Sequence, residues 1–148
     1  MVIIMDENKV LDKDLSDFKY SIFMEIMNGM KMKMNMKNYM KACSHLGYSF
    51  DYLQEEIEVE TEMKLGGKGI IFTTSENDVF VVTINEIKNI GFDMNLFFMD
   101  TIDPVRKLTI EFPDTSYASL VFEMISLYMD GYSIDETSKK VFIDNCYV

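Results

Sequence analysis

The chain has 148 residues and a net charge of −11, with 48% hydrophobic and 13% aromatic residues. This apolar content is high enough to form a core, which excludes an intrinsically disordered acidic chain. No apolar run approaches the roughly 20 residues of a membrane-spanning helix, and the negative charge repels nucleic acid and anionic membranes. The composition therefore predicts a folded protein whose partner is neither a membrane nor a nucleic acid.

Residues 1–148 are expected to form a single domain, because no low-complexity or Ser/Gly-rich linker interrupts them. Residues 1–7 have neither the basic region nor the apolar region of a signal peptide, so they indicate a short edge strand or a leader, and the cytoplasm is the expected compartment. Cys43 and Cys146 show no metal or redox spacing and are expected to be free, buried thiols.

The first elements differ in the clarity of their patterns. Residues 14–28 place apolar side chains on one helical face and end before Gly29, so a helix is predicted. Residues 30–37 alternate Met with Lys or Asn, which is a strand pattern, although Met and Lys themselves favour helix. Both assignments stay open for that segment. Residues 38–46 are predicted to form a helix that ends at Gly47.

The middle of the chain predicts antiparallel strands. Residues 56–65 alternate apolar and acidic side chains, and turn residues separate them from two further strands at 70–74 and 79–84. These strands form a meander over residues 56–84. A second hairpin is expected over residues 95–112, with Pro104 in its turn.

Two helices are predicted to follow the strands. Asp114 or Ser116 caps a helix with an apolar stripe that ends near Gly131. Ser133 and Glu136 have the spacing of a capping box for a last helix. The predicted fold class is therefore α+β, with an antiparallel sheet of about five strands packed against N-terminal and C-terminal helices.

Residues 42–53 carry a local pattern that resembles the centre of a helix-turn-helix. Ala42 is the small residue, Leu46 and Gly47 close one helix, and Ser49 caps the next. The resemblance implies a second helix that enters the major groove of DNA. In this chain that helix would present carboxylates to the phosphates, which argues against DNA reading. An alternative hypothesis is a regulatory module that dimerises or docks through this corner.

Charge is concentrated in two adjacent blocks. Residues 26–50 contain four lysines and no acid, whereas residues 51–63 contain six acids and no base. On a strand, the glutamates at 56, 58, 60 and 62 would form a row with a spacing of about 6.6–6.8 Å. One interpretation is that the row imitates phosphates and binds a basic groove. The other is a solvated face, balanced across the strands by Lys31, Lys33 and Lys37.

Enzyme signatures are missing from the sequence. It has no phosphate-binding glycine loop, no dinucleotide fingerprint, no nucleophile elbow and no zinc-protease motif. His45 has no companion ligand, and on a helix its spacing of two from Cys43 would point the two side chains apart. We therefore assign no catalytic, cofactor-binding or metal-binding residue. A small enzyme with unrecognised carboxylate chemistry is a second alternative.

The main functional hypothesis is a non-catalytic acidic interaction protein, an inhibitor or immunity-type factor that binds a basic protein. In charge and size it resembles phage-type anti-defence decoys and antitoxin-like proteins. The expected partner is a nucleic-acid-handling protein, which the chain would bind as a nucleic-acid mimic, and a homodimer is a further option. The predicted partner-binding residues are Asp51, Glu55, Glu56, Glu58, Glu60 and Glu62.

Overall fold

A computed structural model describes residues 10–66 and 68–147 of the chain. The strand or leader predicted for residues 1–7 lies outside these described residues. The elements in chain order are α1 (Lys13–Met27), β1 (Lys31–Cys43), β2 (Ser49–Leu65), β3 (Gly69–Thr74), β4 (Val79–Thr83), η2 (Ile84–Glu86), β5 (Ile87–Asp93), β6 (Leu96–Thr101), β7 (Arg106–Glu111), α2 (Thr115–Met129), α3 (Ile134–Phe142) and η3 (Asp144–Cys146).

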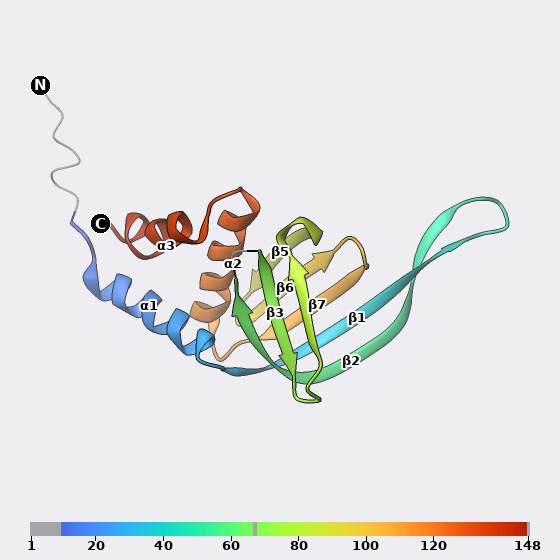
Figure 1. Ribbon diagram of the computed structural model, residues 1–148, viewed down its shortest axis with the longest axis horizontal. Coiled ribbons are helices and arrows are strands. Elements are labelled where there is room, and N and C mark those ends of the chain that lie inside the picture. Colours follow the sequence, from blue (N-terminus) through green and yellow to red (C-terminus); the bar gives the residue numbers. More distant parts are fainter. Residues whose placement is uncertain (1–9, 67, 148) are drawn as a thin grey trace, which may run out of the picture.

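The strands form one curled antiparallel sheet in the order β4-β3-β2-β1-β7-β6-β5 (Figure 1). All three helices gather at one end of the sheet, where α2 packs on β5 and β6. At the other end the β1–β2 hairpin projects away from the body. The predicted α+β class is confirmed, and the prediction of about five strands is wrong because β1 and β5 were not counted.

The core lies between the inner face of the sheet and the helices, of which α2 contributes the most buried residues. Strand residues enter it at alternate positions, as the period of a half-buried strand requires. Met32 and Met34 of β1 are buried there, so part of the Met-rich segment is ordinary core. The fully buried large side chains from both layers include Met34, Met63, Phe72, Phe97, Ile110, Met124 and Ile125.

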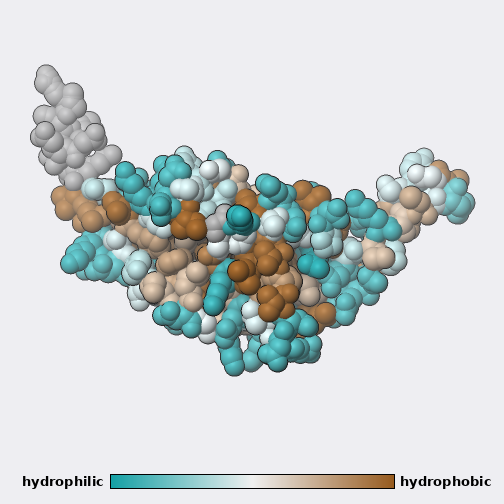
Figure 2. Space-filling view, viewed as in Figure 1, coloured by the Kyte–Doolittle hydropathy of each residue, from teal (hydrophilic) through white to brown (hydrophobic). Residues whose placement is uncertain are grey.

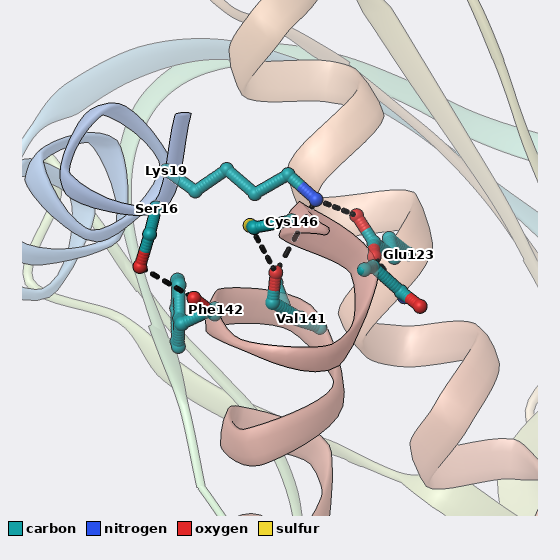
Figure 3. A network of polar contacts seen from close by, with 7 residues as sticks. Ser16, Lys19, Glu123, Val141, Phe142 and Cys146 are labelled. Atoms are coloured by element: carbon teal, nitrogen blue, oxygen red, sulfur yellow. Dashed lines mark hydrogen bonds and ion pairs between the residues drawn. The ribbon is translucent and has the colours of Figure 1, made fainter. Parts of the chain in front are cut away.

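A polar network joins the helices at the end far from the hairpin (Figure 3). The Nζ of Lys19 on α1 lies 3.4 Å from Oε2 of Glu123 on α2 and 3.3 Å from the carbonyl oxygen of Val141 on α3. The buried Cys146 thiol also donates to the Val141 carbonyl, at 3.4 Å. Cys146 is therefore a structural thiol, as expected. Cys43, by contrast, is exposed on β1, so the prediction of a buried thiol there is wrong.

Several predicted elements are confirmed. The helix of residues 14–28 is α1, the meander is β2–β3–β4, and the second hairpin is β6–β7. The capping box of α3 forms with both of its hydrogen bonds, from the Glu136 amide to the Ser133 hydroxyl and from the Ser133 amide to the Glu136 carboxylate. These elements share strong local signals, either a clean period or a capping residue.

The helix predicted for residues 38–46 is wrong. Residues 31–43 form one continuous strand, which also resolves residues 30–37 as strand. Met, Lys and Ala favour a helix in isolation, but pairing with β2 along the whole strand, and with β7 as far as Asn38, overrides that preference. For residues 39–43 the partners are residues 49–53 of β2, on the other side of the turn, and a helical pattern read over residues 38–46 does not include them.

The helix-turn-helix resemblance is also wrong, because residues 44–48 form the turn of the β1–β2 hairpin. Gly47 adopts a φ of +89°, the left-handed conformation that glycine tolerates. The Ser44 hydroxyl accepts a hydrogen bond from the Tyr48 amide at 3.2 Å. A glycine with positive φ and a serine hydroxyl that accepts from a backbone amide are common in hairpin turns as well as between two helices, so the same local pattern fits both.

Gly69 on β3 is the glycine whose replacement is expected to be most disruptive. A Cβ built there would lie 2.4 Å from the Val82 carbonyl oxygen and 2.9 Å from the Thr83 Cα, both backbone atoms of β4. Gly69→Ala is therefore expected to lower the free energy of unfolding by about 1–3 kcal/mol, as overpacking does. Urea unfolding checks this. Gly91→Ala is the control, because its Cβ would meet nothing within 4 Å and should cost nothing. Equal losses of unfolding free energy in the two variants would contradict the close approach of β3 and β4 at Gly69.

Tyr117 links α2 to α1 in a way that predicts a pH effect. Its hydroxyl donates to Oε2 of Glu25 at 2.6 Å, and this hydrogen bond to a carboxylate, with burial, raises the pKa of Tyr117 to about 12. The ordinary tyrosine pKa is near 10, so between pH 10 and 12 the folded state holds a proton that the unfolded state has lost. The contribution of this bond to the free energy of unfolding is fully present below pH 10 and is lost as the pH rises through 12.

Urea unfolding from pH 9 to pH 12 tests this contribution in wild type and Tyr117→Phe. The phenylalanine lacks the titrating hydroxyl, so the stability advantage of wild type over the variant is expected to shrink across that range. Other tyrosines titrate equally in both proteins and cancel in the difference. A stability difference independent of pH would contradict the assignment of the Tyr117–Glu25 bond.

Candidate functional site

The most distinctive surface of the molecule is the arm, which we define as residues 39–54 of the β1–β2 hairpin. Pairing of β1 with β7 ends at Asn38 and Arg106, and pairing of β2 with β3 begins only at Thr61. Beyond those points β1 and β2 pair with each other alone. At about 3.3 Å per residue, β1 continues for roughly 17 Å past Asn38 before the turn. The arm is therefore a two-stranded ribbon with open edges.

One face of the arm is apolar. Met40 pairs with Tyr52 and Ala42 with Phe50, and alternation along the strands places these four side chains on the same face. The Phe50 and Tyr52 rings lie 6.5 Å apart between centroids. Phe50 is 50% exposed, and no element of the described chain packs over this face.

The turn at the end of the arm adds further apolar surface. Leu46 is 74% exposed and Tyr48 72% exposed. In Figure 2 hydrophobic surface appears at the outer end of the arm, beside hydrophilic residues. His45 and Cys43 are exposed nearby. The arm therefore presents aromatic and aliphatic groups on a projecting, solvated element.

The base of the arm is fixed to the body. The Tyr39 amide donates to the Val105 carbonyl oxygen at 3.0 Å, and the Nζ of Lys107 lies 5.7 Å from the centre of the Tyr39 ring. The Nε of Arg106 donates to Oδ1 of Asn38 at 3.1 Å. Between arm and body is a depression of about 460 Å³ that Lys41, Asp51, Lys88, Asp100 and Lys107 help to line. These contacts orient the arm, while its apolar face stays free.

All six predicted partner-binding residues lie on β2. Asp51 is in the arm, opposite Lys41, and Glu55 is at its base, opposite Asn38. The glutamates at 56, 58 and 60 are exposed along the outer face of the sheet, and Glu62 is half-buried at the end of the same row. Glu56, Glu58, Glu60 and Glu62 therefore form one row on the outer face of β2. Asp51 lies on the same face beyond Leu53, and Glu55 points to the opposite face.

The row is matched by lysines on the neighbouring strand. Lys37, Lys33 and Lys31 of β1 pair with Glu56, Glu60 and Glu62, while Glu58 pairs with Asn35. The balancing register predicted from sequence is thus confirmed. Within the described residues, no lysine of this ladder comes within 4 Å of a carboxylate, and the Asn35 side-chain amide donates to Oε1 of Glu56 at 3.1 Å. Opposite charges across strands stabilise the sheet by roughly 0.2–1 kcal/mol per pair.

Metal-binding side chains do not cluster in the described part of the chain. In residues 10–66 and 68–147, no group of three or more His, Cys, Asp or Glu side chains could hold a metal ion. Sequence reasoning missed the apolar face of the arm, because the helix predicted for residues 38–46 separated Met40 from Phe50 and Tyr52. The available signal was the alternation of Phe50 and Tyr52 with the polar residues Ser49 and Asp51.

Comparisons with known proteins bear on the fold. No protein-family model matches the sequence, and no curated protein matches it significantly. A solved structure, the Inner Membrane Complex sub-compartment protein 3 of Toxoplasma gondii, is similar with a TM-score of 0.51 and 11% sequence identity. The match covers 82% of this chain and 87% of that one. At this identity the likeness concerns the fold alone. No helix in the described part of the chain is long and apolar enough to cross a membrane.

Proposed function

We propose that this chain is a non-catalytic interaction protein that binds a protein partner through the arm. The observation that carries the proposal is the exposed apolar face of the arm, formed by Met40, Phe50 and Tyr52 and continued by Leu46 and Tyr48 at the turn. Contiguous exposed apolar patches with polar borders are typical of protein interaction sites. An isolated two-stranded hairpin is marginally stable in water, so a partner that covers this face would also stabilise the arm.

The charge of the molecule narrows the class of partner. A net charge of −11 attracts a basic protein over long range and raises its association rate at low salt. Glu55 projects from the same face as the apolar side chains and would border the contact, whereas Asp51 and Glu56 project from the opposite face of β2. We therefore propose a partner with a basic rim around an apolar pocket. A protein that handles nucleic acid has such a basic surface, and binding there would make this chain an inhibitor or immunity-type factor.

Two kinds of contact are proposed to contribute to binding in different ways. The aromatic side chains of the arm would supply most of the affinity, because buried aromatic residues dominate binding energies at interfaces. The carboxylates of β2 would supply attraction and orientation, because exposed charges act mainly on association and salt dependence. The cross-strand lysines reduce the local negative field, which favours this supporting role over a complete imitation of nucleic acid.

The proposal is tested by capturing proteins from extract of the cells that make this chain. Wild type and an arm variant, Phe50→Ser with Tyr52→Ser, serve as parallel baits, and a salt gradient followed by mass spectrometry identifies what elutes. A basic protein held by wild type and lost by the arm variant would support the proposal. Equal capture by both baits would refute a role for the arm.

The carboxylates require a separate variant. Changing Glu56, Glu58, Glu60 and Glu62 together to glutamine keeps their shape and removes their charge. Affinity for the captured partner at low salt is expected to fall about tenfold, and the dependence of affinity on salt should weaken. Unchanged affinity at low salt would show that the glutamate row is only a solvated face.

A further inference from the structure

The edge of β2 that faces away from β1 has unpaired backbone groups. The Ser75 amide donates to the Glu60 carbonyl oxygen at 2.8 Å, so the backbone groups of Glu60 point toward the β3 side. Residues two apart on a strand point the same way, so the N–H and C=O of Glu58 and Glu56 also point to that side. There β3 no longer runs alongside, because its pairing begins at Thr61. Among the described residues, no strand pairs with residues 49–59 of β2 on this side, so they form an open strand edge.

The two faces beside this edge differ in chemistry. Glu56 and Glu58 project from the outer face, as does Asp51 within the arm. Ile57 and Val59 project from the inner face and are half-buried, and Tyr52 continues that face into the arm. A strand added at the edge would therefore meet carboxylates on one side and apolar groups on the other.

This arrangement disfavours a second copy of the chain at the edge. Two β2 edges brought together would place their glutamates side by side, and like charges across strands are destabilising. At the base of the arm Asn38 pairs with Glu55 but Tyr39 pairs with Leu53, so Gln54 bulges out of β2. This bulge interrupts the edge, and the inner-face Glu55 adds charge there, and both oppose self-pairing. A cationic segment from another protein meets no such repulsion.

Resting on the proposed function, we infer that the β2 edge takes up an extended segment of the partner as an added strand. That segment alternates lysine or arginine with apolar residues. Its backbone pairs with Glu56 and Glu58, its cations lie beside the outer-face carboxylates, and its apolar side chains lie beside Ile57, Val59 and Tyr52. Strand addition of this kind takes affinity from main-chain hydrogen bonds and specificity from alternate side chains.

A pair of synthetic peptides of about eight residues tests the inference. One alternates lysine and valine, and the other has the same composition with its lysines and valines in separate blocks. Fluorescence anisotropy measures the affinity of each labelled peptide for the full chain. The alternating peptide is expected to bind at least about tenfold more tightly, because it alone can place its cations on one face of a strand. Equal affinities, or no binding of either peptide, would overturn the inference.

Two substitutions at one position separate pairing from charge. Glu58→Gln removes a carboxylate, whereas Glu58→Pro also removes the N–H that points to the open edge and leaves the β1 ladder intact. The proline variant is expected to lose at least about tenfold more affinity for the alternating peptide than the glutamine variant. Equal effects would mean that charge alone binds the peptide.

Amide hydrogen exchange of the wild-type protein decides the matter if the proline variant does not fold. Added alternating peptide is expected to slow exchange of the Glu56 and Glu58 amides, and unchanged exchange would overturn strand addition. The proposed function stands or falls separately, because capture of a partner through Phe50 and Tyr52 does not depend on these peptides.

Discussion

Phe50→Ser combined with Tyr52→Ser is expected to weaken binding of the partner about a hundredfold or more. Each ring is about half exposed on the apolar face of the arm, and aromatic anchors of this kind contribute about 2 kcal/mol or more when a partner covers them. The same variant should lose no more than about 1 kcal/mol of unfolding free energy, because neither ring belongs to the core. Surface plasmon resonance with the captured partner and urea unfolding measure the two quantities.

The control for the arm variant removes exposed apolar groups elsewhere. Phe18 on α1 is 52% exposed, and Met94 between β5 and β6 is 73% exposed. Phe18→Ser with Met94→Ser is expected to leave the affinity within about twofold of wild type. Loss of affinity in both variants would indicate a general effect of surface hydrophobicity and would contradict a specific role for the arm.

Phe72→Ala is expected to lower the free energy of unfolding by about 3–5 kcal/mol. Phe72 lies on β3 with no exposed surface, and its ring stacks on Phe80 with centroids 5.1 Å apart. Truncation of a fully buried phenylalanine removes apolar burial and leaves a cavity. Total stabilities of single domains are about 5–15 kcal/mol, so this one change would remove a large share. Urea or thermal unfolding measures the loss.

Ile71 provides a matched control on the same strand. It is the neighbour of Phe72, points to the opposite face and is 36% exposed. Ile71→Ala should therefore cost about 1 kcal/mol or less. If the two variants lost similar stability, the faces of β3 would be wrongly assigned, because a shift of one residue in register exchanges them.

The parts of the fold that sequence predicts are those with local signals. β2 beyond Glu56 alternates cleanly, β3 and β4 are rich in Ile, Val and Phe, and α3 has its capping box. β5 was missed because the register slips between Ile87 and Asn89. A bulge of this kind breaks the alternation on which strand prediction depends.

The arm was missed because pairing between two strands, and not local helix preference, forms it. Within the arm Tyr39 faces Leu53 and Cys43 faces Ser49, so the paired residues are only 6 to 14 positions apart on the two sides of the turn. Locally, Met, Lys and Ala favour a helix, and Gly47 suits a helix end as well as a hairpin turn. The wrong helix also concealed the apolar face, since it separated Met40 from Tyr52.

The sequence predicts the acidic part of the candidate site but not its apolar part. The acidic row on β2 follows from alternation alone, and the structure places its residues along one strand as expected. The register that sets lysines opposite three of the glutamates was one of two interpretations, and only the pairing of β1 with β2 decides it. The apolar part of the site depends on the extension of β1 and β2 beyond β7 and β3, which no local sequence pattern indicates.

Site-specific photocrosslinking tests most directly whether the arm is the binding element. A photoreactive phenylalanine analogue replaces Tyr48 at the turn of the arm in one protein, and replaces Phe98 on the outer face of β6 in another. Both positions are exposed aromatic residues. Expressed in the cells that make this chain, the analogue at position 48 is expected to crosslink one basic protein that position 98 does not reach. Crosslinking from position 98 alone, or the same products from both positions, would contradict the central role of the arm.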